Sequence, residues 1–469
     1  MKIYNTMSRQ KEELETLVPG EVKIYACGPT VYNYIHIGNA RPICVFDVLR
    51  RYLEYRGMKV TYVQNFTDID DKIIRRAEEE HTDYLTVSRK YIAEYKKDAA
   101  GLNVRPATVH PLATENIDEI ISIVSTLVEK GYAYATADGD VYFRTGKFAE
   151  YGKLSHQPLE DLQAGARISV GETKESAMDF ALWKSAKPGE PFWESPWGKG
   201  RPGWHIECSA MARRYLGETI DLHCGGQDLI FPHHENEIAQ SECCNGVPFA
   251  KYWMHNGYIN VDNTKMSKSL GNFFTVRDVA EKYGYEPIRY LMVASHYRMP
   301  VNYSVEVIEQ CKASLERLYN CRDNLEFVLQ NAPAGEKPGE AEIRESLASH
   351  REDFIRAMDD DLNTADAIAA LFELAREINT KCSASEAPSK ELCEFALALF
   401  QELADVLGLL YAKKQPASLD QEIEDLIARR AEARKNKDWA TADAIRDELK
   451  ARHVILEDTP QGVKWRIAE

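Results

Sequence analysis

A short segment that joins a strand to a helix constrains this fold more than any other part of the chain. Residues 22–26 are rich in β-branched and aromatic side chains, as buried strands are. Apolar residues then recur at helical spacing over 43–57. Gly28 and Pro29 interrupt the strand, and Asn39 stands where a helix N-cap is expected. We therefore predict a strand-to-helix crossover at this point.

The N-terminus of the predicted helix is suited to binding a phosphate. Its first backbone N–H groups have no partner within the helix, and the helix dipole adds partial positive charge. His36 and Asn39 lie just before this end and can donate hydrogen bonds to the same anion. The pattern His-x-x-Asn is weak evidence by itself, because a structural capping role explains it equally well.

The residues that follow predict an open parallel sheet. Residues 59–65 alternate as a second strand and lead into a polar loop at 67–72. A strand, a helix and a second strand with a polar loop at the strand end form a βαβ unit. No Gly-x-Gly-x-x-Gly follows the first strand, which argues against a dinucleotide-binding domain.

Further along, the chain changes character several times. Residues 132–195 are rich in glycine and tryptophan and predict a β-rich insertion. A strand at 220–223 enters a glycine-rich loop, and Pro232 is placed as the first residue of the next helix. Helical periodicity dominates from Val305 to about Leu410, and two helices and a hairpin follow. We predict an α/β fold: a Rossmann-like parallel-sheet catalytic domain with a β-rich connective insertion, then an α-helical bundle and a small C-terminal α+β domain.

Composition narrows the class of protein. The chain has 469 residues, of which 44% are hydrophobic, so several globular domains are expected. The sequence contains no run of eighteen apolar residues, so we expect no membrane span. Residues 1–11 do not resemble a signal peptide. Ten scattered cysteines do not form a disulfide framework and favour a reducing, cytoplasmic location. The net charge of −16 argues against non-specific coating of nucleic acid, although local basic patches can still bind a folded RNA.

Four residues are candidate metal ligands, namely Cys27, Cys208, His233 and Glu237. His233 and Glu237 stand four apart on one predicted helix, so both can reach one ion. The alternative is that the cysteines are small buried hydrophobes and the His–Glu pair is a helix contact. His234 can also pair with Glu237, at a spacing of three, and local geometry does not choose between the two histidines.

Other candidates also have structural explanations. Lys265 and Lys268 bracket a polar loop, where lysines are usually only solvated. Trp204 is either a pocket residue or core filling. Asp228 follows two glycines and either binds a ribose or caps the next helix.

A basic run precedes Trp439 near the C-terminus. A basic helix face is usually only exposed to solvent, but basic residues beside an exposed aromatic also suit an unstacked RNA base. The run consists of Arg429, Arg430, Arg434, Lys435 and Lys437.

Taken together, five motifs resemble a known family. His36-Ile37-Gly38-Asn39 resembles the first signature of class I aminoacyl-tRNA synthetases, with Asn39 in place of the family's final histidine, and Lys265-Met266-Ser267-Lys268-Ser269 matches the second. The resemblance narrows to the cysteinyl-tRNA synthetase family through Cys27-Gly28-Pro29-Thr30, Trp204-His205-Ile206-Glu207-Cys208 and His233-His234-Glu235-Asn236-Glu237.

The resemblance implies one zinc ion per chain, held by Cys27, Cys208, His233 and Glu237. In the family, this zinc takes the thiolate of the substrate as an additional ligand. Zinc binds thiolate sulfur well, whereas a serine hydroxyl stays protonated and competes poorly. An apolar pocket separates such close analogues only about 100-fold, so a metal that requires a thiolate explains selection without a separate editing domain.

The resemblance also assigns roles around the predicted crossover. It implies catalytic roles for His36, Asn39 and Lys268, and Lys268 would meet the ATP phosphates as charge develops on them. The implied cysteine-binding residues are Gly28, Thr67, Trp204 and His223. The implied ATP-binding residues are His36, Gly38, Asn39, Asp228, Lys265 and Lys268. Trp439 and Asp443 are the expected tRNA contacts.

We therefore expect a cysteine–tRNA ligase that forms cysteinyl-adenylate from L-cysteine and ATP with Mg²⁺, and passes cysteine to the 3′-terminal adenosine of tRNA(Cys). We expect a monomer with no membrane partner. Two alternatives are a related ligase with a small amine acceptor, which the C-terminal region opposes, and a catalytically inactive tRNA-binding paralogue, which intact Lys268 opposes. The expected division is 1–131 and 197–254 for the two halves of the catalytic domain, 132–196 for the insertion, 255–304 for the KMSKS loop and stem-contact region, 305–412 for the helical bundle and 413–469 for the anticodon-binding domain.

Overall fold

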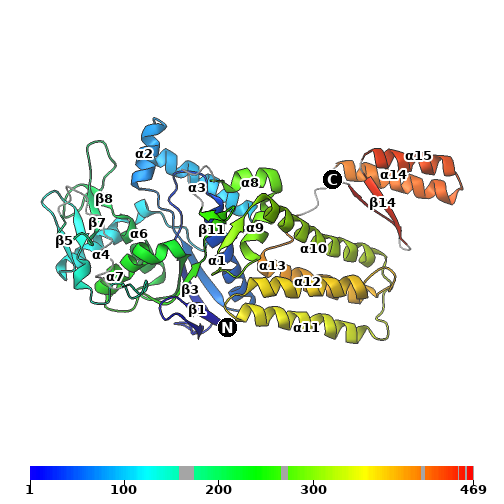
Figure 1. The fold of residues 1–469 in the computed structure, drawn as a ribbon, viewed down its shortest axis with the longest axis horizontal. Helices are drawn as coiled ribbons and strands as arrows, with labels where there is room; N and C mark the ends of the chain where they lie inside the picture. The colour runs from blue at the N-terminus through cyan, green and yellow to red at the C-terminus, as the bar shows by residue number, and fades with distance from the viewer. Residues whose placement is uncertain (158–173, 266–272, 413–417, 453, 460–461, 468–469) are drawn as a thin grey trace. The chain divides into compact units, whose positions relative to one another are not determined.

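The computed structural model describes residues 1–157, 174–265, 273–412, 418–452, 454–459 and 462–467 (Figure 1). These residues form two compact units, each built from several segments. Within the described part of the chain, no helix has the length and apolar character needed to cross a membrane. The first unit comprises Met1–Leu315, Phe354–Ile368 and Val406–Leu409, and the second comprises Glu316–Asp353, Ala369–Asp405 and Leu410–Glu469.

A four-stranded parallel sheet organises the first unit. The strand order is β10-β9-β3-β4, so the chain leaves β3 to one side for β4 and later returns to its other side for β9. The carboxyl ends are in register, because Ala26 lies beside both Gln64 and Cys224. A switch of direction of this kind opens a crevice beyond the strand ends. The strands are β3 (Glu21–Ala26), β4 (Lys59–Gln64), β9 (Ile220–Gly226) and β10 (Ala250–Asn256).

Helix α1 (Ile37–Tyr55) follows β3, as the sequence predicts, but it begins three residues earlier than expected. His36 is the N-cap, with an extended backbone, and Asn39 lies inside the first turn. The Asn39 side-chain oxygen reaches back and accepts a hydrogen bond from the His36 backbone N–H at 3.1 Å. The prediction of Asn39 as the N-cap is therefore wrong, because its amide acts from the third helical position.

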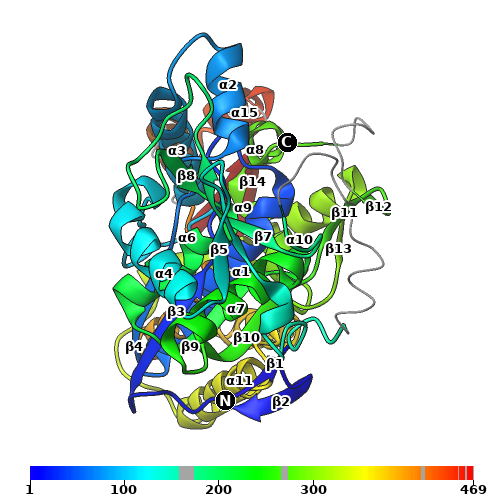
Figure 2. The same cartoon turned by 90° about the vertical axis from the view of Figure 1, so that its left-hand side faces the viewer.

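A β-rich insertion is present as an antiparallel sheet of order β5-β6-β7-β8, but its last strand, β8, lies beyond the expected end at residue 196. Helix α4 packs against β5 (Figure 2). A hydrophobic core joins this sheet to α6 and α7. The elements are α2 (Asp71–Glu79), α3 (Tyr84–Gly101), α4 (Ile117–Glu129), β5 (Ala133–Ala135), β6 (Val141–Phe143), β7 (Phe180–Ser185), β8 (Gly200–Pro202), α6 (Trp204–Leu216) and α7 (Glu235–Asn245).

Pro232 is the first residue after a kink that precedes α7. It lies in an irregular turn over residues 230–234, and a cis peptide bond joins Phe231 to Pro232. The helix itself begins at Glu235. Within residues 230–234 only Phe231 has a non-helical, extended backbone, so the kink lies before Pro232 and the proline stands on the helical side of it, as the sequence predicts.

A smaller sheet adjoins the crevice. Strands β11 and β13 are parallel, and β12 pairs antiparallel with β11. Thr275 caps α8 through a hydrogen bond with the backbone of Asp278, as expected for a helix that opens here. These elements, with the N-terminal hairpin, are β1 (Lys2–Asn5), β2 (Gln10–Glu13), β11 (Ile259–Val261), β12 (Thr264–Lys265), α8 (Val276–Tyr283), α9 (Tyr285–Val293) and β13 (Val301–Tyr303).

The C-terminal part of the chain is mainly helical. The His350 side chain pairs with Glu377, and Arg351 pairs with Glu402, so α11 contacts both α12 and α13. Beyond them, β14 and β15 form the predicted hairpin, and α14 and α15 pack on it. The elements are α10 (Val305–Asn331), α11 (Glu340–Asp359), α12 (Thr364–Lys381), α13 (Lys390–Leu407), α14 (Ser418–Lys435), α15 (Trp439–Ala451), β14 (Val454–Thr459) and β15 (Gly462–Ile467).

Candidate active site and metal centre

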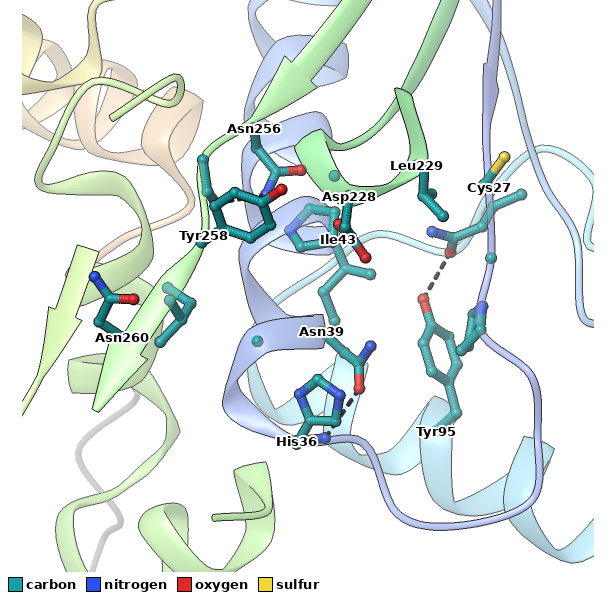
Figure 3. A pocket seen from close by; sticks show the side chains of 18 residues that line it. Cys27, His36, Asn39, Ile43, Tyr95, Asp228, Leu229, Asn256, Tyr258 and Asn260 are labelled. Carbon is teal, nitrogen blue, oxygen red and sulfur yellow. Dashed lines mark hydrogen bonds between the residues drawn. The ribbon is translucent and has the colours of Figure 1, made fainter. Parts of the chain in front are cut away.

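A cavity of about 550 Å³ lies at the carboxyl ends of the parallel strands. The crossover supplies one wall through Cys27, Gly28 and the first turns of α1 (Figure 3). The turn after β9 and the segment 256–260 after β10 supply the opposite wall. The cavity therefore occupies the crevice that the strand order creates.

The N-terminus of α1 forms one end of the cavity. His36, Gly38 and Asn39 all line it, and Figure 3 shows the hydrogen bond that holds the Asn39 side chain beside His36. Because the Asn39 oxygen is the acceptor in this bond, its amide N–H₂ group stays available as a donor. Backbone N–H groups, the helix dipole and this amide suit a phosphate.

The segment that follows residues 266–272 is attached directly to this end of α1. The Ile37 N–H donates to the Phe274 carbonyl at 3.1 Å, and the Val276 N–H donates to the Ile35 carbonyl at 2.9 Å. The Phe273 ring lies edge-on to the His36 ring, with centroids 5.2 Å apart. Lys265 is the last residue of β12, and Lys268 lies outside the described residues.

Asp228 lines the cavity from the turn after β9. It is exposed, and the residues at the N-cap positions of the two following segments are Leu229 and His234, so Asp228 is not the N-cap of α7. Its carboxylate is thus placed to accept hydrogen bonds from a ligand hydroxyl.

The four predicted metal ligands converge beside this cavity. Their ligand atoms all lie within 4.8 Å of one another. Cys27 Sγ is 3.8 Å from Cys208 Sγ and 3.5 Å from Glu237 Oε1. His233 Nε2 is 2.9 Å from the same Glu237 oxygen. Three segments that are distant in the sequence therefore meet in one compact donor cluster.

A second donor set shares Cys27 and Glu237 and adds His223 and His234. His223 Nε2 is 2.7 Å from Glu237 Oε2, and His234 Nε2 is 3.3 Å from Cys27 Sγ. The side chains of both His233 and His234 thus reach the cluster. Zinc prefers thiolate sulfur, and the first set offers two cysteines, so the donor chemistry favours the set that contains His233.

The donor cluster carries charge. Burial opposes ionisation of Glu237, but His223 and His233 beside it hold the pKa of this carboxyl well below its usual range. Burial alone would lower the pKa of His233, yet the Glu237 carboxylate and Cys208 raise it to about 10. A hydrogen bond from Cys27 lowers the pKa of Cys208 to about 6. A divalent cation fits such a cluster, because it can replace the protons on Cys27 and His233.

Of the four residues expected to bind cysteine, Gly28 follows Cys27, Trp204 and His223 contact members of the donor cluster, and Thr67 bonds to Glu207, which precedes Cys208. The Gly28 N–H donates to Asn65 Oδ1 at 2.8 Å, and the backbone approach is so close that a Cβ at Gly28 would lie 1.6 Å from the Asn65 carbonyl oxygen. Thr67 is buried, and His223 is fully buried against Glu237. The Trp204 ring lies 4.2 Å from the His233 ring, and because it is 40% exposed, core filling does not explain it.

Several site residues were not predicted from the sequence. Glu207 is buried and accepts a hydrogen bond from Thr67 Oγ1 at 2.8 Å. His205 Nδ1 lies 2.9 Å from His233 Nδ1. His255 Nε2 lies 2.8 Å from His234 Nδ1. Glu207 and His205 belong to the Trp204–Cys208 motif, which was the available signal.

The expected tRNA contacts lie in the second unit, on α15. Trp439 is the first residue of this helix and is 59% exposed. Asp443 is also exposed and pairs with Arg446 at 3.2 Å. An exposed tryptophan is available for stacking on a base. Arg430, by contrast, is almost fully buried, so the basic run does not present one continuous exposed face.

Family models match three parts of the chain. Residues 13–313 match the tRNA synthetases class I (C) catalytic domain. Residues 353–411 match the DALR domain, and residues 417–466 match the cysteinyl-tRNA ligase anticodon binding domain.

Whole-chain relatives agree with these matches. A cysteine–tRNA ligase of Caldicellulosiruptor saccharolyticus is 56% identical over 466 residues, with 99% of both chains covered. One of Clostridioides difficile is 58% identical over 469 residues, with 99% of this chain and 100% of the relative covered. Among solved structures, Mycobacterium tuberculosis methionyl-tRNA synthetase in complex with methionyl-adenylate shares the fold, with a TM-score of 0.59. Its sequence is 16% identical, and the match covers 82% of this chain and 89% of that chain. The chain therefore belongs to the cysteine–tRNA ligase family of class I tRNA synthetases.

Proposed function

We propose that the chain activates L-cysteine with ATP to form cysteinyl-adenylate and pyrophosphate, and then transfers cysteine to the 3′-terminal adenosine of tRNA(Cys). One observation carries this proposal beyond family membership. The cavity of about 550 Å³ at the strand ends is called the nucleotide cavity below. Cys27 lines this cavity and also belongs to the donor cluster. Through Cys27, the donor cluster therefore adjoins the cavity that holds the N-terminal end of α1, as the joining of cysteine to ATP requires.

The donor cluster fits one zinc ion held by Cys27, Cys208, His233 and Glu237. When bound, zinc would supply a Lewis acid that prefers thiolate sulfur to a hydroxyl group. Gly28, Thr67, Trp204 and His223 would enclose the rest of the amino acid. Thr67 and Glu207 hold each other in place, so the wall facing the substrate is set before binding.

Activation needs no nucleophile from the enzyme. The cysteine carboxylate attacks the α-phosphorus in line, and pyrophosphate leaves; Mg²⁺ brought with ATP would supply further positive charge near the phosphates. His36, Gly38 and Asn39 would receive the phosphates at the end of α1, and Asp228 would accept from the ribose hydroxyls. We assign Lys265 and Lys268 to the leaving phosphates, where added positive charge stabilises the transition state more than the ground state.

Transfer to tRNA would take place in the cytoplasm and would use the C-terminal regions. Residues 305–412 and 413–469 are proposed as the helical tRNA-binding domain and the anticodon-binding domain. Trp439 and Asp443 are the proposed base contacts. The match of residues 417–466 to an anticodon binding domain supports a tRNA acceptor rather than a small amine.

Pyrophosphate exchange with each of the twenty amino acids tests the activation step. We expect exchange with cysteine alone, in a zinc-loaded enzyme without tRNA, followed by acylation of tRNA(Cys) when it is added. Lys268→Ala should lower the maximal exchange rate and leave the KM for cysteine nearly unchanged. Exchange that is equally fast with serine, or cysteine activation without acylation of tRNA(Cys), would contradict the proposal.

A further inference from the structure

A second cavity, of about 300 Å³, lies behind the nucleotide cavity. It is enclosed by α1, β4, α3 and residues 104–110. Ile43, Gln64 and Tyr95 line both cavities, so they form a shared wall. Figure 3 shows Tyr95 in this wall, with its hydroxyl donating to Gln64 Oε1 at 2.6 Å. None of the metal-cluster residues lines the second cavity.

The interior of this cavity is apolar and aromatic. Ile43, Tyr62, Tyr95 and Ala99 are all at least nine-tenths buried there. The ring nitrogens of His110 are both engaged, because Nδ1 lies 2.9 Å from the Gln64 carbonyl oxygen and Nε2 accepts from a backbone N–H. Burial lowers the pKa of His110, so its ring stays neutral. A ligand that enters must therefore be apolar over most of its surface.

The mouth of the cavity is cationic. Arg50 and Arg105 line it and share the carboxylate of Glu54, with N–O distances of 2.8 and 2.7 Å. Lys96 also lines the cavity; it is exposed and forms no ion pair within the described part of the chain. Positive charge at this mouth therefore exceeds negative charge.

The one acid that lines the cavity is already paired. Asp47 is buried and accepts hydrogen bonds from Arg51 at 2.7 Å and from Arg289 at 2.6 Å. Its other oxygen accepts the backbone N–H of Arg105 at 2.9 Å. Asp47 thus does not cancel the positive charge of Lys96.

We propose that this cavity is a second ligand site, which takes a flat aromatic carboxylate with its ring inside and its anionic group at Lys96. The volume falls within the range of small-molecule sites, and the aromatic lining favours stacked or edge-on rings. The site would also regulate activation, a claim that rests on the proposed function. A ring in the cavity would press on the shared wall and on Ile43, one helical turn beyond Asn39.

Binding of 2-naphthoate to the full-length, zinc-loaded protein tests the site, with saturating ATP present to fill the nucleotide cavity. Isothermal titration should show one saturable site per chain. Lys96→Gln should weaken binding about threefold to fivefold, as expected for one partly exposed ion pair. Lys97→Gln is the matched control, because this neighbouring exposed lysine does not line the cavity, and it should bind normally. The neutral analogue 2-naphthamide should bind as weakly to the unmodified protein as 2-naphthoate binds to Lys96→Gln.

Three results would overturn the site: no saturable binding in the presence of saturating ATP, equal affinity for 2-naphthamide, or equal weakening by both lysine variants. A filling variant, Ala99→Leu, should abolish binding, and a melting temperature near that of the unmodified protein would show that it folds. Regulation is tested by pyrophosphate exchange, in which saturating 2-naphthoate should change the KM for ATP about fivefold. An unchanged KM for ATP would refute regulation. Because binding is measured without turnover, a failure of cysteine activation is distinguishable from a failure of the site.

Discussion

Replacing Arg41 with methionine should weaken ATP binding and leave cysteine binding intact. Arg41 lies in α1 just after Asn39, and its side chain is completely buried. Its guanidinium donates to four backbone carbonyl groups at the end of α9 and in the segment that follows it. The acceptors are those of Met292, His296 at 3.0 Å, Tyr297 at 3.3 Å and Met299 at 3.2 Å.

This segment sets the position of the opposite wall of the nucleotide cavity. The Gly257 N–H donates to the Tyr297 carbonyl at 2.8 Å, and the Val301 N–H donates to the Tyr258 carbonyl at 2.9 Å. Gly257 and Tyr258 both line the cavity. Arg41 therefore links the phosphate-binding end of α1 to the wall that faces it.

The stability cost follows from two opposing effects. Each hydrogen bond from a charged donor contributes about 1.5–3 kcal/mol. Burial of the charge opposes this and lowers the pKa of Arg41 to about 10, a shift that corresponds to about 3 kcal/mol. With four such bonds, the net loss in Arg41→Met should be about 3–9 kcal/mol, or at least about 5–10 °C in melting temperature.

The kinetic effect separates positioning from stability. A wall displaced by about 1 Å should lower kcat/KM for ATP about 10- to 100-fold. The KM for cysteine should change less than about twofold, because Arg41 contacts none of the donor cluster. Arg41→Lys keeps the charge but reaches fewer carbonyls, so its effect should be intermediate.

Pyrophosphate exchange, with ATP and cysteine varied separately, provides the assay. Arg56→Gln is the control, because Arg56 ends α1 and pairs with Asp359 away from the cavity. This control should lower the melting temperature without changing the KM for ATP. Equal changes in both substrate KM values for Arg41→Met, or a loss of stability with normal kinetics, would refute the positioning role.

Three further predictions follow from the site and the C-terminal domain. Cys208→Ser should lower the zinc content, measured by atomic absorption, and weaken cysteine binding in parallel. Normal cysteine affinity in an enzyme that lacks zinc would contradict this prediction. Gly28→Ala should destabilise the protein by about 3 kcal/mol or more in thermal melts, because the new Cβ would lie 1.6 Å from the Asn65 carbonyl oxygen; an unchanged melting temperature would refute the close packing. Trp439→Ala should raise the KM for tRNA(Cys) about tenfold, in line with loss of one stacked base, and leave pyrophosphate exchange unchanged; an unaltered acylation KM would exclude the contact.

The parallel sheet and its crossover were predictable because their signals are local. The strand before Cys27 and the helix ending before Gly57 each have their own periodicity, and the structure places them at Glu21–Ala26 and Ile37–Tyr55. The cap was misassigned for an equally local reason. Asn is a common N-cap, and its placement at the third helical position depends on a backward hydrogen bond to His36 that the sequence pattern does not specify.

The donor cluster required more than periodicity. Spacing paired Glu237 with either His233 or His234, and the structure places both histidines beside the carboxylate, at 2.9 and 4.0 Å. His234 contacts His255, which lies on strand β10. The sequence does not predict this contact, because it depends on the register of β10 in the folded sheet. Only the resemblance to the family selected His233 over His234. The same resemblance identified Lys268, which lies outside the described residues.

The central claim is that a metal site which binds thiolate sulfur selects cysteine for activation. Cobalt substitution tests this claim more directly than any kinetic assay. The two protein cysteines should already give a sulfur-to-cobalt charge-transfer band. Adding L-cysteine should increase this band saturably, with release of the thiol proton, and the concentration at half-saturation should match that in pyrophosphate exchange. L-serine at the same concentrations should leave the band unchanged. A spectrum that does not change at concentrations of cysteine that saturate exchange would contradict the account.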